Sequence, residues 1–153
     1  MIKLYIYYSG IISQEAKTHG KKILNWMIMK KMRRLRKSII KLIITYINKS
    51  EDPQLVVQNF VSPALEILKD YSNNIPEARE ADVHLLFSVI IKKLSFALAA
   101  SIPQILEFMI SVTLQIVTQE FEEFKDHWIN FFDFLQSVIN NCFTGNFFPF
   151  LKA

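Results

Sequence analysis

The stretch LNWMIMKKMRRLRKSIIKLIITYIN, residues 24–48, decides the fold class. Its apolar side chains recur at alternating steps of four and three, at Ile28, Met32, Leu35, Ile39, Leu42 and Tyr46. This spacing places them on one stripe of an α-helix, whereas a strand would need apolar residues at every second position. A second, basic stripe follows the same period at Lys30, Arg34, Lys37 and Lys41. The stretch therefore predicts a long helix that packs its apolar stripe on neighbouring helices.

The rest of the chain repeats this helical pattern and has little material for turns. Its 153 residues include three glycines and five prolines, too few for the turns that a β-sandwich needs every 8–12 residues. Apolar spacing predicts six helices, at about residues 2–18, 24–48, 53–71, 77–96, 102–118 and 123–141. Asp52 and Pro53 suit a helix N-cap and first position. Pro63 predicts a kink or break, because proline lacks the N–H donor.

A weak internal repeat suggests how the helices are arranged. Residues 62–68, SPALEIL, resemble residues 102–108, IPQILEF, and an offset of about forty residues is typical of HEAT repeats. We therefore predict an all-α fold, an α-α superhelix of the HEAT-repeat solenoid type with about three helix pairs. The pairs would span about residues 2–49, 52–97 and 102–142, within a repeat region 1–143, and an irregular apolar tail would follow at 144–153.

Charge is distributed unevenly along the chain. Ten basic residues occur between residues 17 and 41 with no acidic residue among them, and from Leu42 onward thirteen acidic residues face seven basic ones. Such a basic block can bind an acidic protein, nucleic acid or an anionic membrane, or form a solvated flank. Residues 94–119 are apolar overall, but interspersed Ser, Thr and Gln residues break the run of about 20 apolar residues that a membrane span needs. We predict no membrane insertion.

No arrangement of residues predicts catalysis. The three histidines, His19, His84 and His127, fall on three different segments of the chain. Cys142 is the only cysteine, so neither an intrachain disulfide nor a zinc site built on thiolate pairs is available. Glycine-rich phosphate-binding motifs are absent from the sequence. We predict that the chain is not an enzyme and takes no cofactor, metal ion or small-molecule substrate, and that Cys142 is a small buried hydrophobe.

Several short motifs follow one another along the chain: EDPQLV at residues 51–56, NFVSP at 59–63, IPEARE at 75–80, IPQI at 102–105, EFEEFKDH at 120–127 and NFF at 130–132. In this order they resemble the exportin-1 family of nuclear export receptors. The resemblance is clear from about residue 32 to residue 143 and weaker before residue 32. Ala81, Lys125 and Thr144 depart from the family, which tends to have proline at or next to these positions.

The resemblance implies a HEAT fold and a scaffold segment of a transport receptor. Such receptors bind export-signal cargo together with the GTP form of the Ran GTPase, contact nuclear pore proteins and shuttle between nucleus and cytoplasm. The second helix of each pair usually lines the concave side of such rings. The candidate partner-facing residues are therefore Lys30, Arg34, Lys37, Lys41, His84, Ser88, Lys92, Asp126, Asn130 and Asp133. The alternative is a basic helical module that binds nucleic acid or an acidic protein partner.

Overall fold

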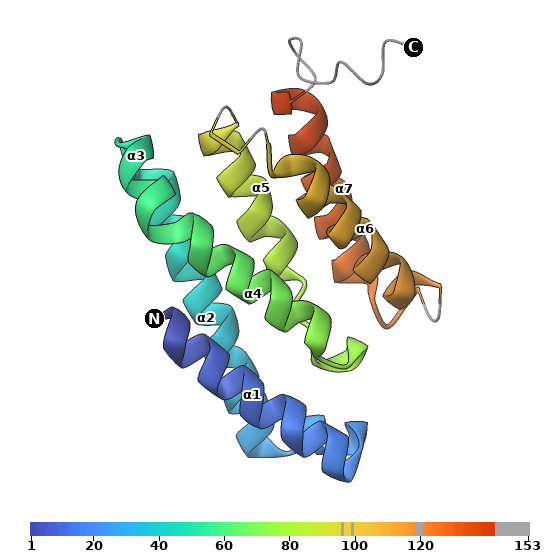
Figure 1. The fold of residues 1–153 in the computed structure, drawn as a ribbon. Coiled ribbons are helices and arrows are strands. Elements are labelled where there is room, and N and C mark those ends of the chain that lie inside the picture. Colours follow the sequence, from blue (N-terminus) through green and yellow to red (C-terminus); the bar gives the residue numbers. More distant parts are fainter. Residues whose placement is uncertain (96, 99, 119–120, 143–153) are drawn as a thin grey trace.

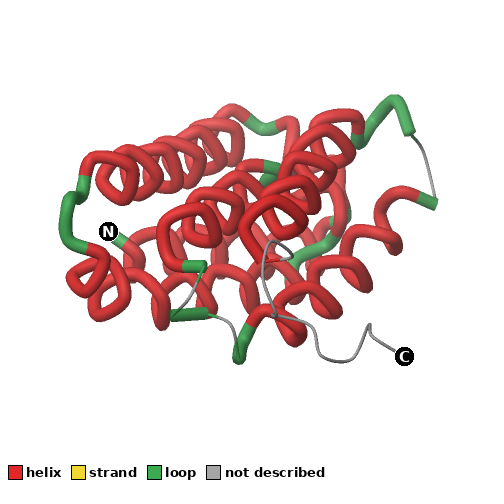
Figure 2. Tube along the Cα trace, turned by 90° about the horizontal axis from the view of Figure 1, so that it is seen from above, coloured by secondary structure: helices red, strands yellow, loops and turns green. Residues whose placement is uncertain are grey.

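A computed structural model of the chain describes residues 1–142, apart from residues 96, 99 and 119–120 and the side chain of Val117. The described residues form helices and loops without any strand (Figure 2). The long helices are α1 (Ile2–His19), α2 (Met27–Lys49), α4 (Ser62–Asn73), α5 (Asp82–Leu94), α6 (Ile102–Val117) and α7 (Lys125–Cys142). The all-α prediction is confirmed, whereas the predicted tail at 144–153 lies outside the described residues.

The helices stack in two layers. Helix α1 packs on α2, α4 on α5 and α6 on α7, and α5 lies between α2 and α7 with the most extensive contacts of the fold. In Figure 1 α1, α4 and α6 lie in front of α2, α5 and α7, and Figure 2 shows the two layers from above. We call α1, α4 and α6 the first layer and α2, α5 and α7 the second layer. This is the expected helical-repeat architecture, while the exact repeat boundaries stay a prediction.

Local sequence determines where the first helices begin and end. Gly20 ends α1 with a positive φ of 78°, a conformation that glycine adopts without a steric penalty. Asp52 caps the single turn α3 (Pro53–Val56), and its carboxylate accepts a hydrogen bond of 2.8 Å from the backbone N–H of Gln54. Pro63 was predicted to kink or break the helix, and the helical backbone continues past it, with its hydrogen-bond pattern changed locally. A π-helical turn, η2 (Val57–Val61), precedes α4 at this point, because Pro63 cannot donate to the preceding turn.

The apolar stripe predicted for α2 is only partly buried. Ile39 is in the core, but Ile28 and Leu42 are 51% and 54% exposed. The buried row of α2 instead consists of Met29, Arg36, Ile39, Ile40, Ile43 and Ile47. Helix α2 carries two apolar rows, and the row that packs against α1 and α5 contains an arginine at its centre. Residue types alone therefore favoured the wrong row.

The connection from α4 to α5 is ordered by one arginine. We predicted a helix from about residue 77, but α5 starts at Asp82 and the short 3-10 turn η3 (Pro76–Ala78) precedes it. Arg79 adopts an extended conformation there. Its guanidinium donates to the carbonyls of Ser72, Asn74 and Val112 at 3.1, 3.0 and 3.4 Å. These bonds tie the loop to both α4 and α6, so the backbone leaves the helical path before α5 begins.

Candidate partner-binding face

The four predicted residues of α2 form one exposed row. Lys30, Arg34, Lys37 and Lys41 are all exposed, and their steps of four, three and four residues keep them on one side of the helix. At a rise of about 1.5 Å per residue, the row extends over roughly 16 Å. Its first three members, together with Arg33, line a shallow depression. We call Lys30, Arg34, Lys37 and Lys41 the basic row.

A groove follows the second layer next to the basic row. It has a volume of about 480 Å³ and lies between α2, α5 and α7. The residues lining it are Ile44, Leu85, Ser88, Val89, Lys92, Asp133, Gln136, Ser137 and Asn140. Three of the ten predicted residues, Ser88, Lys92 and Asp133, therefore come together in one place. Its lining combines aliphatic side chains with one positive charge, Lys92, and one negative charge, Asp133, a combination suited to an amphipathic protein segment.

Two predicted residues do not face a partner. His84 is fully buried: its Nε2 lies 2.9 Å from Oγ1 of Thr113, and its Nδ1 lies 3.2 Å from the carbonyl oxygen of Ala81. Ser88 is also buried, and its hydroxyl donates to the His84 carbonyl at 2.9 Å. The His84 ring thus joins α5 to α6, whereas the Ser88 hydroxyl bonds within α5 itself. The prediction is corrected for both, although Ser88 still borders the groove.

The predicted residues of α7 are divided between surface and internal roles. Asp126 and Asp133 are exposed, whereas the half-buried Asn130 donates through Nδ2 to the carbonyl of Ala81 at 3.1 Å. Burial raises the pKa of Asp82 at the start of α5, and the positive charges of Lys37 and Lys41 oppose this rise. The basic row therefore lies within electrostatic reach of carboxylates on the next helix pair.

Sequence reasoning missed a buried ionic cluster behind the basic row. Glu80 is 2% exposed and Arg36 is 1% exposed. Oε1 of Glu80 lies 2.7 Å from Nη2 of Arg36 and 3.0 Å from Nε of Arg33, and its Oε2 lies 3.6 Å from Nζ of Lys37. One carboxylate thus forms ion pairs with three cationic side chains of α2. The signal was available, because Arg36 stands seven residues from both Met29 and Ile43 and so belongs to the buried row.

Further polar contacts extend this cluster into the first layer. Nη1 of Arg36 donates to the hydroxyl of Ser9 at 2.8 Å, and Nη2 donates to the carbonyl of Ala78 at 2.6 Å. The Ser9 hydroxyl donates to the carboxylate of Asp70 at 2.6 Å. Burial raises the pKa of Asp70, while Ser9 and Arg36 oppose this change. The cluster joins α1, α2, α4 and the loop before α5, and so it fixes how α2 presents the basic row.

A second buried cluster joins the second and third helix pairs. The imidazole rings of His84 and His127, which the sequence places on separate helices, lie 6.1 Å apart. Tyr71 and Phe131 pack on the His84 ring at 5.5 and 5.7 Å. Burial lowers the pKa of His84 to about 3 and that of His127 to about 4, so both rings are neutral at pH 7. Their packing against aromatic rings indicates a structural role.

The described residues include neither a cluster suited to a metal ion nor a helix suited to span a membrane. Nowhere in residues 1–142, the undescribed positions aside, do three His, Cys, Asp or Glu side chains gather in a way that could hold a metal ion. Among the same residues, none of the helices combines the length and the apolar character needed to cross a bilayer. The candidate site is the exposed side of the second layer, with its basic row and groove.

Comparison with known proteins identifies the family. A family model described as CRM1 C terminal matches residues 1–149. The chain belongs to this family, the C-terminal region of exportin-1. It is 33% identical over 146 residues to Protein EXPORTIN 1A of Arabidopsis thaliana and 35% identical over 145 residues to Exportin-1 of Dictyostelium discoideum. Exportin-1 of Schizosaccharomyces pombe is 33% identical over 146 residues.

The alignments cover nearly the whole chain but a small part of these relatives. They include 95% of the chain and 14% of the Arabidopsis protein, and 94% of the chain and 13% of the Dictyostelium protein. The chain thus spans about one seventh of the length of the exportin-1 relatives it matches. The family match begins at residue 1, so it includes α1, where the resemblance read from the motifs is weaker.

A departure from the exportin-1 pattern gives a first prediction. Ala81 has φ −60° at the N-terminus of α5, which is compatible with the proline expected from the family at this position. We expect Ala81→Pro to raise the free energy of unfolding by about 0.4–1 kcal/mol, because proline restricts the unfolded chain. Urea unfolding followed by circular dichroism measures this change, with Ala81→Gly as the control that should destabilise. A loss of stability in Ala81→Pro would show that the native backbone here cannot accept proline.

Proposed function

We propose that the chain is a scaffold segment of a nuclear export receptor, whose second layer faces a protein partner of the whole receptor. Family membership supports the export role, because the matched relatives are exportins. The observation that carries the partner-facing role is the exposed basic row beside an amphipathic groove on the same side of the second layer. No catalytic role is part of the proposal, since receptors of this kind act by binding.

The proposed partners are those of the whole receptor and not of this segment alone. We propose that the receptor binds the GTP form of Ran together with export-signal cargo, contacts nuclear pore proteins and shuttles between nucleus and cytoplasm. Within it, Lys30, Arg34, Lys37, Lys41, Lys92, Asp126 and Asp133 are the exposed candidates for contact with Ran or cargo. Because the row is exposed, its main contribution would be to orient and accelerate association rather than to supply most of the affinity.

A chimaera tests this proposal. The matching segment of the Arabidopsis EXPORTIN 1A is replaced by residues 1–142 of this chain, and Ran-GTP-dependent capture of a fluorescent export-signal peptide is measured by anisotropy. We expect the chimaera to retain this capture. The triple change Lys30→Glu, Arg34→Glu and Lys41→Glu should weaken Ran-GTP binding at least about tenfold, a change of about 1.4 kcal/mol. Lys37 is left unchanged because it also pairs with Glu80.

The matched control changes the net charge by the same amount, at positions outside the basic row. Lys3, Lys17 and Lys49 are exposed, and their triple change to glutamate should weaken binding less than about threefold, as is usual for distant surface charges. Equal losses of Ran-GTP affinity in both triple variants would show that the basic row is not part of the partner-binding surface. A chimaera that folds but captures no peptide in the presence of Ran-GTP would contradict the scaffold role itself.

Binding of nucleic acid remains the second candidate, since a row of four exposed cations could contact phosphates. Acidic side chains near the row argue against nucleic-acid binding. Asp82 lies within electrostatic reach of Lys37, Lys41 and Asp126, and the carboxylates of Asp82 and Asp126 would repel the phosphates of a nucleic acid. An electrophoretic shift with single-stranded RNA that disappears in the triple row variant, together with unchanged Ran-GTP binding, would favour this alternative over the receptor role.

A further inference from the structure

The exposed side of the second layer has an apolar strip along α5. Leu85 and Val89 are half-buried, line the groove and lie four residues apart, so they are neighbours on one side of the helix. Asp82 comes three residues before Leu85, and Lys92 comes three residues after Val89. The strip is therefore about two turns long and ends at a charged residue in each direction. Its groove of about 480 Å³ is within the usual range of binding sites, roughly 300–1,000 Å³.

Cations of α2 lie along one side of this strip. Ile44 of α2 lines the groove, and Lys41 and Lys37 precede it by three and seven residues, which places all three on one side of α2. The positive charges of Lys37 and Lys41 act on the carboxylate of Asp82 at the start of α5. We call Lys37 and Lys41, together with Arg34 one turn earlier, the basic side of the groove.

Carboxylates of α7 lie along the other side. Asp133 lines the groove, and Asp126 comes seven residues earlier, about two turns away on the same side of α7. Both side chains are exposed. The charge of Asp126 also acts on Asp82, so Asp126 lies near the start of α5, as Lys37 does from α2. We call Asp126 and Asp133 the acidic side of the groove.

The distance between the two sides fits one helix. Helix α5 lies between α2 and α7 (Figure 1), and packed helices are about 8–10 Å apart, so the axes of α2 and α7 are roughly 16–20 Å apart. An α-helix with its side chains is about 10–12 Å wide. A partner helix that lies over α5 would therefore have one flank next to the basic side and the other next to the acidic side.

The groove offers a partner mainly side chains. Its lining residues lie within α2, α5 and α7, where backbone N–H and C=O groups bond to one another along each helix. An extended segment would leave its own backbone groups without protein partners here, whereas a helix satisfies them internally. Apolar grooves commonly bind a helix through anchors at i, i+3 or i+4 and i+7. These properties favour a helical partner segment.

We propose that the groove binds an amphipathic helix of a partner protein, in which a flank of carboxylates and a flank of cations border an apolar face. The apolar face packs on Leu85 and Val89, the carboxylates face the basic side and the cations face the acidic side. This inference rests on the partner-facing role proposed for the second layer and names the kind of segment that binds there. A helix with one sign of charge on both flanks would meet like charges on one side of the groove, which selects against it.

Three synthetic peptides test the flank pattern on the full chain. Each is about 18 residues long, roughly 27 Å as a helix, and has the same leucines on one face. The flanks carry glutamate on one and lysine on the other, glutamate on both, or lysine on both. We expect the mixed peptide to bind with a Kd of roughly 10–100 µM, at least about fivefold more tightly than the other two. Fluorescence anisotropy in physiological salt measures the three affinities.

The expected order differs from the order that net charge alone would give. The chain carries a net charge of +4, so attraction by net charge would favour the peptide with glutamate on both flanks. A preference for the mixed peptide, which is nearly neutral, therefore reports the local pattern of the groove.

Reversal of one side should change which peptide binds best. Arg34→Glu with Lys41→Glu makes the basic side net acidic, and this variant should prefer the peptide with lysine on both flanks by at least about fivefold. Asp126→Lys with Asp133→Lys makes the acidic side basic and should prefer the peptide with glutamate on both flanks by a similar factor. Lys37 is left unchanged because it belongs to the buried ionic cluster.

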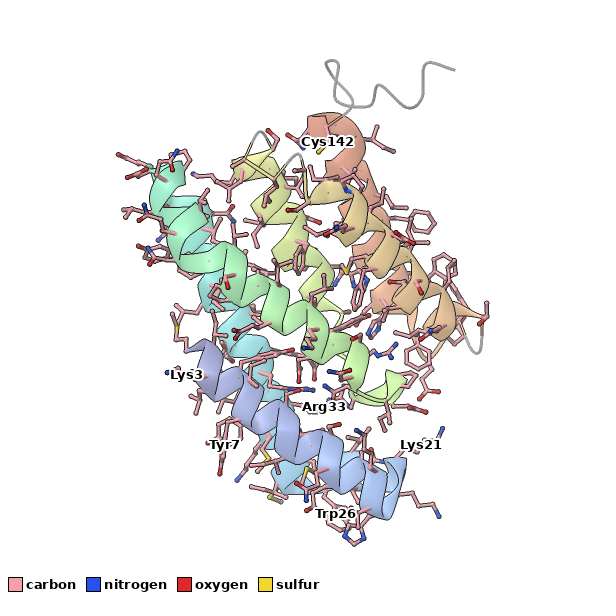
Figure 3. All side chains as sticks on the ribbon, in the orientation of Figure 1. Lys3, Tyr7, Lys21, Trp26, Arg33 and Cys142 are labelled. Atoms are coloured by element: carbon pink, nitrogen blue, oxygen red, sulfur yellow. The ribbon has the colours of Figure 1, made fainter. Side chains whose placement is uncertain are left out.

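Lys3→Glu with Lys17→Glu is the matched control, because it changes the net charge by the same amount as Arg34→Glu with Lys41→Glu. Both lysines are exposed on α1, and Figure 3 shows Lys3 at the start of α1, on the other side of the array from α7. This control should keep the preference for the mixed peptide. Val89→Gln shortens the apolar strip and should weaken binding of the mixed peptide at least about threefold. Circular dichroism checks that each variant keeps its helix content.

The proposal is overturned if the three peptides bind the unchanged chain equally, if none binds with a Kd below about 1 mM, or if reversal of one side leaves the preferred peptide unchanged. The mixed peptide is also added to the Arabidopsis chimaera. Binding to the chain but not to the chimaera would show that another part of the receptor occupies the groove, which contradicts a partner segment there.

The receptor role is judged separately, by capture of the export-signal peptide with Ran-GTP. If this capture persists in the chimaera while no flank pattern is preferred, only the present inference fails. If the mixed peptide binds as expected while the chimaera captures no export-signal peptide, the receptor role fails and the binding chemistry of the groove stands.

Discussion

Glu80→Gln is expected to lower the free energy of unfolding by about 3–5 kcal/mol, the usual cost of breaking a buried ion pair from one side. Glutamine keeps the size of the side chain but removes its charge. Arg36 is then left at 1% exposure without the carboxylate that balances its charge. Arg33 and Lys37 also lose their partner. Because domains are stable by only about 5–15 kcal/mol, this single change removes a large fraction of the total.

Chemical unfolding in urea, followed by circular dichroism at pH 7, measures the effect. Glu77→Gln is the matched control: its carboxylate pairs with Lys21 at 3.3 Å near the surface, and loss of such a pair should cost less than about 1 kcal/mol. If Glu80→Gln costs no more than Glu77→Gln, the buried cluster does not hold the first two helix pairs together.

A paired substitution distinguishes charge balance from packing. Arg36→Met with Glu80→Leu replaces both charges by apolar side chains, and buried ion pairs replaced in this way often lose little stability. We expect the double variant to be more stable than Glu80→Gln alone. The polar groups of Ser9 and Ala78, which Arg36 now satisfies, should keep it somewhat below the unchanged chain. If the double variant is less stable than Glu80→Gln, the hydrogen bonds of Arg36 to Ser9 and Ala78 contribute more to stability than the charge balance does.

Acidification is expected to destabilise the chain through His84 and His127. Burial lowers their pKa values in the folded state to about 3 and about 4, whereas the unfolded chain protonates near the ordinary value of about 6.5. The unfolded state therefore binds more protons below pH 6.5. Stability is full above that pH and falls as the pH drops toward 4, by about 1.4 kcal/mol per pH unit for each histidine.

Urea unfolding at pH 7, 6 and 5 measures this slope. His127→Phe should remove about half of it, because His84 remains. The same change should cost little stability at pH 7, since the buried Nε2 of His127 has no hydrogen-bond partner among the described residues. Burial raises the pKa of Asp70 and Asp82, which offsets part of the slope at lower pH but equally in both chains.

His19→Gln is the control for this experiment. His19 is exposed near Glu15, so its replacement should leave the slope between pH 7 and 5 nearly unchanged. A slope that is the same in His127→Phe and in the unchanged chain would mean that the His84–His127 cluster does not resist protonation. In that case the acid sensitivity would have to come from groups other than these histidines and the carboxylates of Asp70 and Asp82.

The helices could be predicted because their signals are local. Gly20 ends α1, Asp52 and Pro53 start the next helix, and Pro63 follows a π-helical turn in it. Each acts through its own backbone or through a bond to a residue nearby in sequence. The basic row was also predictable, because its four residues follow the helical period and because lysine and arginine side chains are usually exposed to solvent. The family, too, could be recognised from motifs alone, and the family match confirmed it.

The sequence by itself determined which segments are helical, which side of α2 is charged and to which family the chain belongs, since these depend on neighbours along the chain. Only the tertiary structure decided which apolar row of α2 is buried, that Arg36 and Glu80 pair in the interior, and that His84 meets His127. Burial depends on helices distant in sequence that cover a side chain. An arginine joins the core when a carboxylate such as that of Glu80, from another helix pair, balances its charge there.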